Sequence, residues 1–242
     1  MNGMHHVKAA AVSVILIEPE FDLNVGSACR AMANFGFQNL IIVNPKCKLG
    51  RVARMFAKAG KTILGNAKIF KTFDSALEKE KFDYVIGTTS AIYRFRKDLN
   101  DPIPLRKFKL PAKRSVAIAF GRESIGLKRE EAARCDLLMT IETNQETPAI
   151  NLSHAVAIAL YQLSQIPLTT YEPAKVQEKK KLIDTFALLT TLLTVIKKPN
   201  KMQLAFKRLL SRALASKEEV ECVNGVLRFA IKKMIKTMNQ TR

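Results

Sequence analysis

The sequence predicts an α/β protein: a mostly parallel sheet with helices on both faces, followed by a small α-helical C-terminal extension. Two observations predict this class. Short apolar runs alternate with helical patterns up to about residue 164, which is typical of parallel sheets covered by helices. The 242 residues, 48% of them hydrophobic, are also enough to bury a sizeable core.

Five apolar runs have the length and composition of buried strands. They cover residues 12–18, 39–45, 84–90, 115–121 and 137–143. Helical patterns lie between and after them, at residues 25–36, 51–59, 72–80, 127–134 and about 151–164.

The segment 165–181, "QIPLTTYEPAKVQEKKK", has the prolines, threonines and charge run of a linker. We therefore divide the chain into a domain over residues 1–166 and an extension over 167–242. Apolar residues in the extension recur at helical spacing between 202 and 213 and again between 220 and 235. The extension is expected to be helical and amphipathic.

The chain is strongly basic, with 40 Lys and Arg against 21 Asp and Glu and a formal net charge of +19. Such an excess is typical of proteins that meet a polyanion, and nucleic acid is the expected partner. Residues 165–242 hold 16 Lys and Arg against 6 Asp and Glu, a net of +10. The basic extension either contacts RNA or packs its apolar stripes on the core with the charge solvated.

Four separated cysteines, Cys29, Cys47, Cys135 and Cys222, form no CxxC pair. Neither a disulfide framework nor a metal site is expected, and a reducing cytoplasm fits this usage. The N-terminal apolar run breaks into acidic residues and suits a first strand rather than a signal peptide. The apolar run 186–196 is too short to cross a bilayer, so no membrane segment is expected.

The first candidate motif, "NVGSACRAMANFG", follows the first predicted strand. Asn24 is suited to cap the helix after it, and Gly26 permits close approach of another backbone. Arg30 lies six positions after Asn24, so both side chains are expected to face one site. Taken alone, the motif also fits an N-capped helix with an ordinary arginine.

The second motif, "GRESIGL" at residues 121–127, joins an apolar strand to a helical pattern. Gly121 can adopt unusual dihedral angles and leave its N–H free, Glu123 can accept hydrogen bonds from a neighbouring loop, and Gly126 ends the turn. Arg122 is either a solvated side chain or an RNA contact. The loop lacks the GxxxxGK[ST] pattern of a phosphate cradle, and no GxGxxG follows the first strand.

The third motif, "PAINLSHAVAIAL", begins at Pro148, which rigidifies its loop. Asn151 and Ser153 lie at the start of a nearly all-apolar helix, where both residue types commonly cap the first turn. Each motif alone is weak evidence for a ligand site, whereas the order and spacing of the three together are much stronger.

In this order the three motifs resemble those of the SPOUT superfamily of RNA methyltransferases, and within it the TrmJ-type tRNA 2'-O-ribose methyltransferases. The resemblance covers about residues 12–164 and extends weakly into the helical extension. It implies a C-terminal trefoil knot, which periodicity cannot predict because knots are otherwise nearly absent from proteins. It also implies tRNA as the substrate, with nucleotide 32 of the anticodon loop, a cytidine or uridine, as the target.

The resemblance implies S-adenosylmethionine as the cofactor, held largely by backbone groups of three loops. The positions that match these loops are Thr89, Ser90 and Ala91, then Gly121, and then Ile141 with Pro148, Ala149 and Ile150. Many relatives have a serine before the Leu-Asn pair of the third motif, where this chain has Ala149 and Ile150, so a hydroxyl role there is in doubt.

The family pattern gives Arg30 the central catalytic role, with Asn24, Asn151, Ser153 and Glu123 as supporting residues. Arg30 acts either as a base or by placing charge beside a phosphate and the developing alkoxide. The family acts as a homodimer with each active site at the interface. The alternatives to this function are a non-catalytic basic RNA-binding protein on the same fold and a methyltransferase of another RNA.

Overall fold

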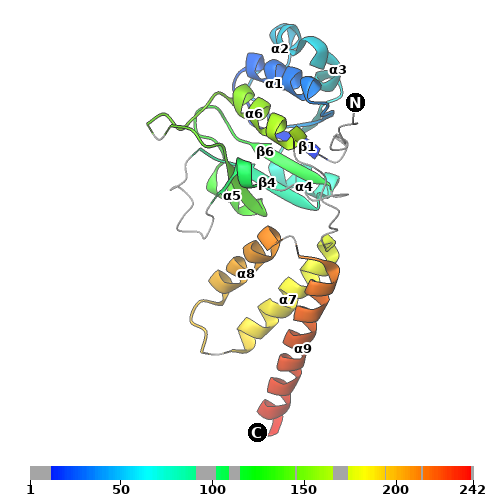
Figure 1. Ribbon diagram of the computed structural model, residues 1–242, viewed down its shortest axis with the longest axis vertical. Helices are drawn as coiled ribbons and strands as arrows, with labels where there is room; N and C mark the ends of the chain where they lie inside the picture. The colour runs from blue at the N-terminus through cyan, green and yellow to red at the C-terminus, as the bar shows by residue number, and fades with distance from the viewer. Residues whose placement is uncertain are drawn as a thin grey trace. The chain divides into compact units, whose positions relative to one another are not determined.

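The protein is described by a computed structural model at residues 12–90, 102–108, 115–144, 146–165, 174–193, 195–213 and 215–240. The chain divides into two compact units, Met1–Thr169 and Thr170–Arg242. Within the described part of the first unit, seven parallel strands form one sheet (Figure 1). In chain order they are β1 Val12–Ile17, β2 Asn39–Val43, β3 Lys68–Phe70, β4 Tyr84–Thr88, β5 Ile103–Pro104, β6 Val116–Phe120 and β7 Leu137–Thr140.

The sheet has the strand order β3-β2-β1-β6-β4-β7-β5. Because every pairing is parallel, the carboxyl ends of all strands lie at one edge of the sheet. The chain leaves β1 toward β2 on one side, while β6 and β4 lie on the other. In open α/β sheets such an edge is where ligands bind.

All five predicted strands are present, each ending one to three residues earlier than its apolar run. The short strands β3 and β5 were not predicted, because two or three residues give no periodic signal. The predicted helices are also present. The helices of this unit are α1 Asp22–Asn34, α2 Arg51–Ala57, η2 Lys58–Gly60, α3 Lys61–Gly65, α4 Phe73–Glu80, η4 Leu105–Lys107, α5 Arg129–Arg134 and α6 Leu152–Gln165.

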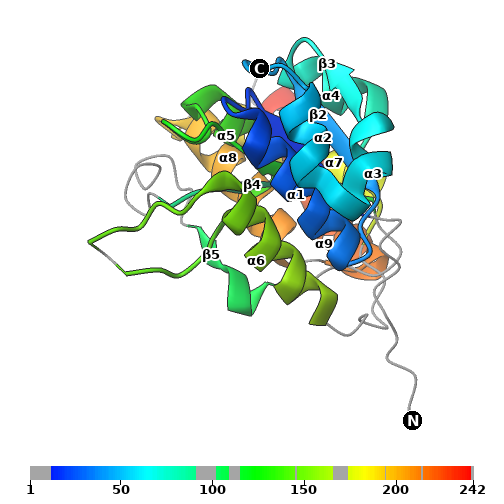
Figure 2. The same ribbon diagram turned by 90° about the horizontal axis from the view of Figure 1, so that it is seen from above.

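Helices cover both faces of the sheet (Figure 1). On one face α4 and α5 pack against strand side chains such as Ile15, Ile41 and Ala117. Strand side chains alternate between faces, so fully buried neighbours such as Leu16 and Ile118 point to the other face, which α1 and α6 cover. Seen from above, α1 lies between α2 and α6 (Figure 2).

The second unit consists of α7 Val176–Leu192, α8 Pro199–Ala213 and α9 Lys217–Gln240. Its small core comprises Ala174, Leu182, Leu210 and Val220, and the rings of Phe186 and Phe206 stack with their centroids 4.0 Å apart. The expected helices after residue 202 are therefore confirmed. The linker interpretation was wrong for residues 176–181: their charge run forms the first turns of α7, which buries Lys179 and Leu182.

No helix in the described ranges of the chain is long and apolar enough to cross a membrane. The four cysteines are free: Cys29 and Cys135 are buried, Cys47 is half-buried and Cys222 is exposed. Burial raises the pKa of the Cys29 thiol to about 12.

Candidate active site

A pocket of about 250 Å³ opens at the carboxyl edge of the sheet. Three loops line it: the residues after β4, the loop after β6, and the segment between β7 and α6. The family resemblance implied these same three loops as a cofactor site. The predicted positions that line the pocket are Thr89, Ser90, Gly121, Ile141, Pro148, Ala149 and Ile150. Ala91, also predicted, lies outside the described residues.

Gly121 is required by its own loop rather than by free space in the pocket. A Cβ at this position would collide with the backbone of Gly126 and Leu127, so the loop can close on itself only around a glycine. Backbone hydrogen bonds between Arg122 and Gly126 seal this turn. Unusual dihedral angles were expected at Gly121, but the positive φ in this loop is at Gly126, where it is 67°.

Four of the five predicted catalytic residues form one chain of hydrogen bonds. The Nδ2 of Asn24 donates to a Glu123 carboxylate oxygen at 2.8 Å, and the Oδ1 of Asn24 accepts from the Nδ2 of Asn151 at 2.9 Å. The Oδ1 of Asn151 in turn accepts from the backbone N–H of Ser153 at 2.9 Å and from its hydroxyl at 2.7 Å. Segments about 100 residues apart in sequence are thereby joined at one point.

The amide of Asn24 bridges loops instead of capping its helix. The helix α1 begins at Asp22 with Phe21 in the N-cap position and no side-chain cap bond. Glu123, which belongs to another loop, binds the backbone at this end of the helix instead. Its carboxylate accepts hydrogen bonds from the backbone N–H groups of Glu20 at 2.9 Å and of Phe21 at 3.4 Å. Asn24 is buried away from water, and both the Nδ2 and the Oδ1 of its amide have hydrogen-bond partners within the protein. Asn151 does cap α6, as its residue type predicted.

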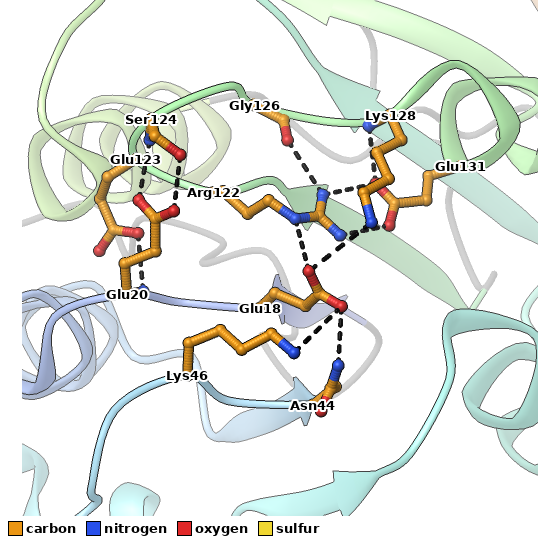
Figure 3. Close-up of polar contacts among 10 residues, drawn as sticks. All are labelled: Glu18, Glu20, Asn44, Lys46, Arg122, Glu123, Ser124, Gly126, Lys128 and Glu131. Carbon is orange, nitrogen blue, oxygen red and sulfur yellow. Dashed lines mark hydrogen bonds and ion pairs between the residues drawn. The ribbon is translucent and has the colours of Figure 1, made fainter.

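Arg122 is neither a solvated side chain nor an RNA contact. Its side chain is 5% exposed and forms a two-bonded fork with Glu131, at 2.9 and 2.8 Å, while its Nε donates to Glu18 at 2.7 Å (Figure 3). The arginine thereby ties the start of the 121–127 loop to the end of β1 and to α5.

The ion cluster shifts the pKa values of its members. The hydrogen bond from Arg122 lowers the pKa of Glu18 to about 2, and a second hydrogen bond, from Asn44, acts in the same direction. Burial opposes ionisation of Glu131, yet the bonds from Arg122 outweigh it and lower the pKa of that carboxyl. In return the two carboxylates, Glu131 first, raise the pKa of Arg122.

Glu20 makes a further contact that sequence reasoning missed. Its carboxylate accepts the backbone N–H of Ser124 at 2.9 Å and the Ser124 hydroxyl at 2.6 Å (Figure 3). Since Glu123 binds the backbone of Glu20, the two loops hold each other reciprocally. The acids of "EPE" after the first strand were the available signal, because acids at the carboxyl end of a parallel strand are placed to meet neighbouring loops.

Arg30 stands apart from this network. Six residues of α-helix advance about 9 Å and turn the side chain well away from Asn24. The Arg30 side chain is exposed, and no hydrogen bond or ion pair joins it to another described residue. The structure thus gathers Asn24, Asn151, Ser153 and Glu123, but not Arg30.

The charged side chains that line the pocket limit the class of ligand that it can bind. Among the described residues that line it, Arg122 and Glu123 carry charge, and both are held in the contacts above. No free cation faces the pocket from the described residues, so a phosphate-rich ligand has no counter-charge there. Among the same residues no group of three or more His, Cys, Asp or Glu is placed to hold a metal ion.

Comparisons with known proteins agree with this architecture. Residues 11–161 match the SpoU rRNA Methylase family. The chain is 37% identical over 220 residues to the tRNA (cytidine-2'-O-)-methyltransferase TrmJ of Methanocaldococcus jannaschii, covering 86% of this chain and 94% of that protein. It is 34% identical to the protein of the same name from Sulfolobus acidocaldarius, covering 95% and 97%.

Solved structures show the same fold. A probable methylase family protein from Haemophilus influenzae Rd KW20 is 27% identical and superposes with a TM-score of 0.66 over 96% of this chain and 99% of that one.

Proposed function

The chain belongs to the SpoU rRNA methylase family, and we propose that it transfers a methyl group from S-adenosylmethionine to a ribose 2'-oxygen of tRNA. The proposed target is nucleotide 32 of the anticodon loop, with cytidine as the first candidate and uridine as the second. The names of the two archaeal relatives, both cytidine-2'-O-methyltransferases, support this order.

One observation carries the proposal: the three loops at the carboxyl edge enclose a pocket that is fastened to α1 by the Glu123–Asn24–Asn151–Ser153 chain. The pocket fits S-adenosylmethionine by its chemistry. A sulfonium cation needs no cationic partner, and the described lining offers none. The apolar side chains of Ile141, Ile150 and Leu152 suit an adenine ring, and exposed backbone at Ser90 and Ala149 suits its polar edge.

When bound, S-adenosylmethionine supplies an electrophilic methyl carbon. On transfer of this methyl group to the ribose 2'-oxygen, the carbon–sulfur bond would break with its electron pair going to sulfur, and the hydroxyl proton would pass to solvent. The residues of this chain hold the two reactants in line, which is a placement effect. Asn24, Asn151, Ser153 and Glu123 are positioning residues, because their polar atoms are engaged with one another.

Arg30 is the proposed catalytic residue. A guanidinium stays protonated in proteins, so a base role would need a strong perturbation. We assign it instead to hold the phosphate next to the target ribose and to stabilise the alkoxide charge that develops at the 2'-oxygen. Its exposure and its lack of a partner among the described residues leave the planar fork available for RNA.

The active form is proposed to be a homodimer, the commonest oligomer of soluble proteins. Four large apolar side chains of α1, its N-cap and α6 are exposed: Phe21, Leu23, Ile158 and Tyr161. Pairing of two copies would cover these side chains, and it would bring Arg30 of one protomer close to RNA held by its partner.

The second unit is proposed to contribute to tRNA binding. It carries 16 Lys and Arg after residue 164, and α9 exposes Arg228, Lys232, Lys233 and Lys236. The helices leave apolar residues such as Val226 and Phe229 about 70% exposed among these cations, and aromatic rings can stack on unpaired bases.

The direct test is nucleoside mass spectrometry of an unmodified tRNA incubated with the protein and S-adenosylmethionine labelled in the methyl group. Labelled 2'-O-methylcytidine that maps to nucleotide 32 is the expected product. Label on a base, or transfer to ribosomal RNA but not to tRNA, would contradict the assignment. If cofactor binding is also absent by calorimetry, the protein is a non-catalytic RNA binder.

A further inference from the structure

A second charge asymmetry lies within the α/β unit itself. Residues 23–73 contain nine Lys and Arg and no Asp or Glu. Two of the nine pair with acids from other segments: Lys46 approaches Glu18 at 3.7 Å, and Lys68 bonds Glu80 at 2.7 Å. The remaining seven have no such partner among the described residues.

One of these seven is the proposed catalytic arginine, Arg30 in α1, and four more lie on the three consecutive helical segments α2, η2 and α3. We call them the α1–α3 basic surface. Its members are Arg30, Arg51, Arg54, Lys58 and Lys61. All five are exposed, and no hydrogen bond or ion pair joins their side chains to another described residue.

Close backbone packing places these cations along α1. A Cβ on Gly26 would collide with the backbone of Ala53 in α2, and a Cβ on Gly60 would collide with the backbone of Cys29 and Arg30. The segment from α2 to η2 therefore runs alongside α1 in the same direction, as Figure 2 shows for α1 and α2. Lys58 and Lys61 flank the glycine that touches the backbone of Arg30.

Lys58 has an unfavourable backbone conformation. Its φ is 49° and its ψ is −112°, a combination that favours glycine over any residue with a Cβ. The sequence nevertheless has an exposed lysine here, at the first residue of η2. Strain at an exposed residue beside a functional site is a reason to look for a role of its side chain.

We infer that the α1–α3 basic surface holds the phosphate backbone of the substrate RNA and leads it to Arg30, with Lys58 as a phosphate contact. The inference rests on the proposed function for the identity of the RNA. Cations without acidic neighbours attract phosphates regardless of sequence, so this surface supplies affinity and register rather than base choice. An ordinary solvated face would instead mix both signs of charge, as α4 does with Asp74, Glu78 and Lys79.

The backbone of Lys58 allows a sharp test, because Lys58→Gly removes the charge while relieving the strain. Lys81 provides the matched control: it is also an exposed lysine with positive φ, at 52°, but it ends α4 on the other face of the sheet. In the full-length protein, both Lys58→Gly and Lys81→Gly should keep or raise the melting temperature. Lys58→Gly alone should weaken binding of an unmodified tRNA transcript.

The size of the effect follows from counterion release. Each lost phosphate contact should flatten the dependence of log affinity on log salt by about 0.7 to 0.9. The triple variant Arg51→Met, Arg54→Met, Lys58→Met should flatten the slope by about 2 to 3. It should also raise KM for tRNA more than it lowers kcat, and leave S-adenosylmethionine binding by calorimetry unchanged.

Two outcomes separate this inference from the proposed function. Unchanged tRNA affinity and salt slope in Lys58→Gly and the triple variant, with wild-type protein methylating tRNA, would overturn the inference alone. If the wild-type protein binds tRNA but transfers no methyl group, the proposed function fails, whereas flatter slopes in the variants would still support this surface as an RNA contact.

Discussion

The loop network at the pocket and the α1–α3 basic surface both adjoin α1, but their charged groups are arranged in opposite ways. At the pocket, Arg122 is buried between two carboxylates and Asn24 has both ends of its amide engaged. On the basic surface, Arg30 and four other exposed cations have no partner among the described residues. The polar groups of the loop network bind one another, whereas the cations of the basic surface remain available to an external ligand.

The difference separates two kinds of contribution to function. Polar groups whose partners lie within the protein fix geometry, and removing one of them leaves the others buried and unsatisfied. Exposed cations contribute little to folding, so their placement is free to serve an external partner. Substitutions in the first region should therefore change stability and cofactor binding, and substitutions in the second should change catalysis and RNA binding.

The largest effect is expected for Arg30→Ala. Loss of a transition-state contact of this kind lowers turnover by about 100-fold to 1000-fold or more. The melting temperature and the affinity for S-adenosylmethionine should stay unchanged, because Arg30 contacts neither the pocket nor the loop network. Single-turnover methyl transfer, with calorimetry on the same sample, measures both quantities.

Arg30→Lys decides how the arginine acts. A lysine keeps the positive charge but lacks the planar fork. Substantial remaining turnover would favour charge placement, whereas loss equal to that of alanine would favour a specific guanidinium geometry. A fall in the affinity for S-adenosylmethionine in either variant would contradict the view that the loop network, and not the basic surface, governs cofactor binding.

The next largest effect is expected for Arg122→Met, which leaves Glu18 and Glu131 without their shared partner. Breaking a buried ion pair in this way costs about 3–5 kcal/mol of folding stability. The salt dependence of tRNA binding should not change, since Arg122 does not reach RNA. Chemical denaturation measures the first quantity, and Arg134→Met, which removes an exposed arginine of the neighbouring helix, is the control.

The sequence predicted the strands and most helices, because hydrophobic periodicity is a local signal. The three pocket loops were implied by the family that the order of the motifs resembles. The sequence could not predict the role of Arg122, since an arginine after a glycine looks the same whether it is solvated or buried. The partners that decide the matter, Glu18 and Glu131, come from other elements. For the same reason Asn24 was predicted to cap its own helix, whereas its amide bridges two distant loops.

The boundaries of the second unit show a different limit. The run "VQEKKK" has the composition of a linker, yet it forms the start of α7, where Glu178 accepts the backbone N–H of Lys175, Lys179 is buried and Leu182 joins the small core. The trefoil knot implied by the family resemblance stays a prediction. The roles of the predicted site residues also stay predictions, and the variants above and below address them.

A smaller effect is expected for Glu123→Gln. The carboxylate accepts hydrogen bonds from Asn24 and from the backbone of Glu20 and Phe21. An amide keeps one acceptor oxygen but turns an N–H group toward these donors, which should cost about 2–3 kcal/mol of stability. Cofactor affinity should fall as well, because the 121–127 loop loses its hold on α1. Unchanged affinity for S-adenosylmethionine in a folded variant would show that the hydrogen bonds of Glu123 do not shape the pocket.

The smallest expected effect is a pH dependence at Glu18, within the ion cluster. The hydrogen bond from Arg122 lowers the folded-state pKa of Glu18 to about 2, below its ordinary value of 4.5. A carboxyl with a depressed pKa stabilises the fold fully above pH 4.5 and loses that contribution as the pH falls toward 2. Glu18→Gln should therefore cost about 1.5 kcal/mol at pH 7, the range of a hydrogen bond to a charged group, and the difference from wild type should narrow below pH 4.5. Glu78→Gln, a change at an exposed acid of α4, should show neither effect. Urea denaturation of the three proteins between pH 7 and pH 3 measures the difference; a gap that stays constant over this range would mean that the carboxylate of Glu18 is not what Arg122 stabilises.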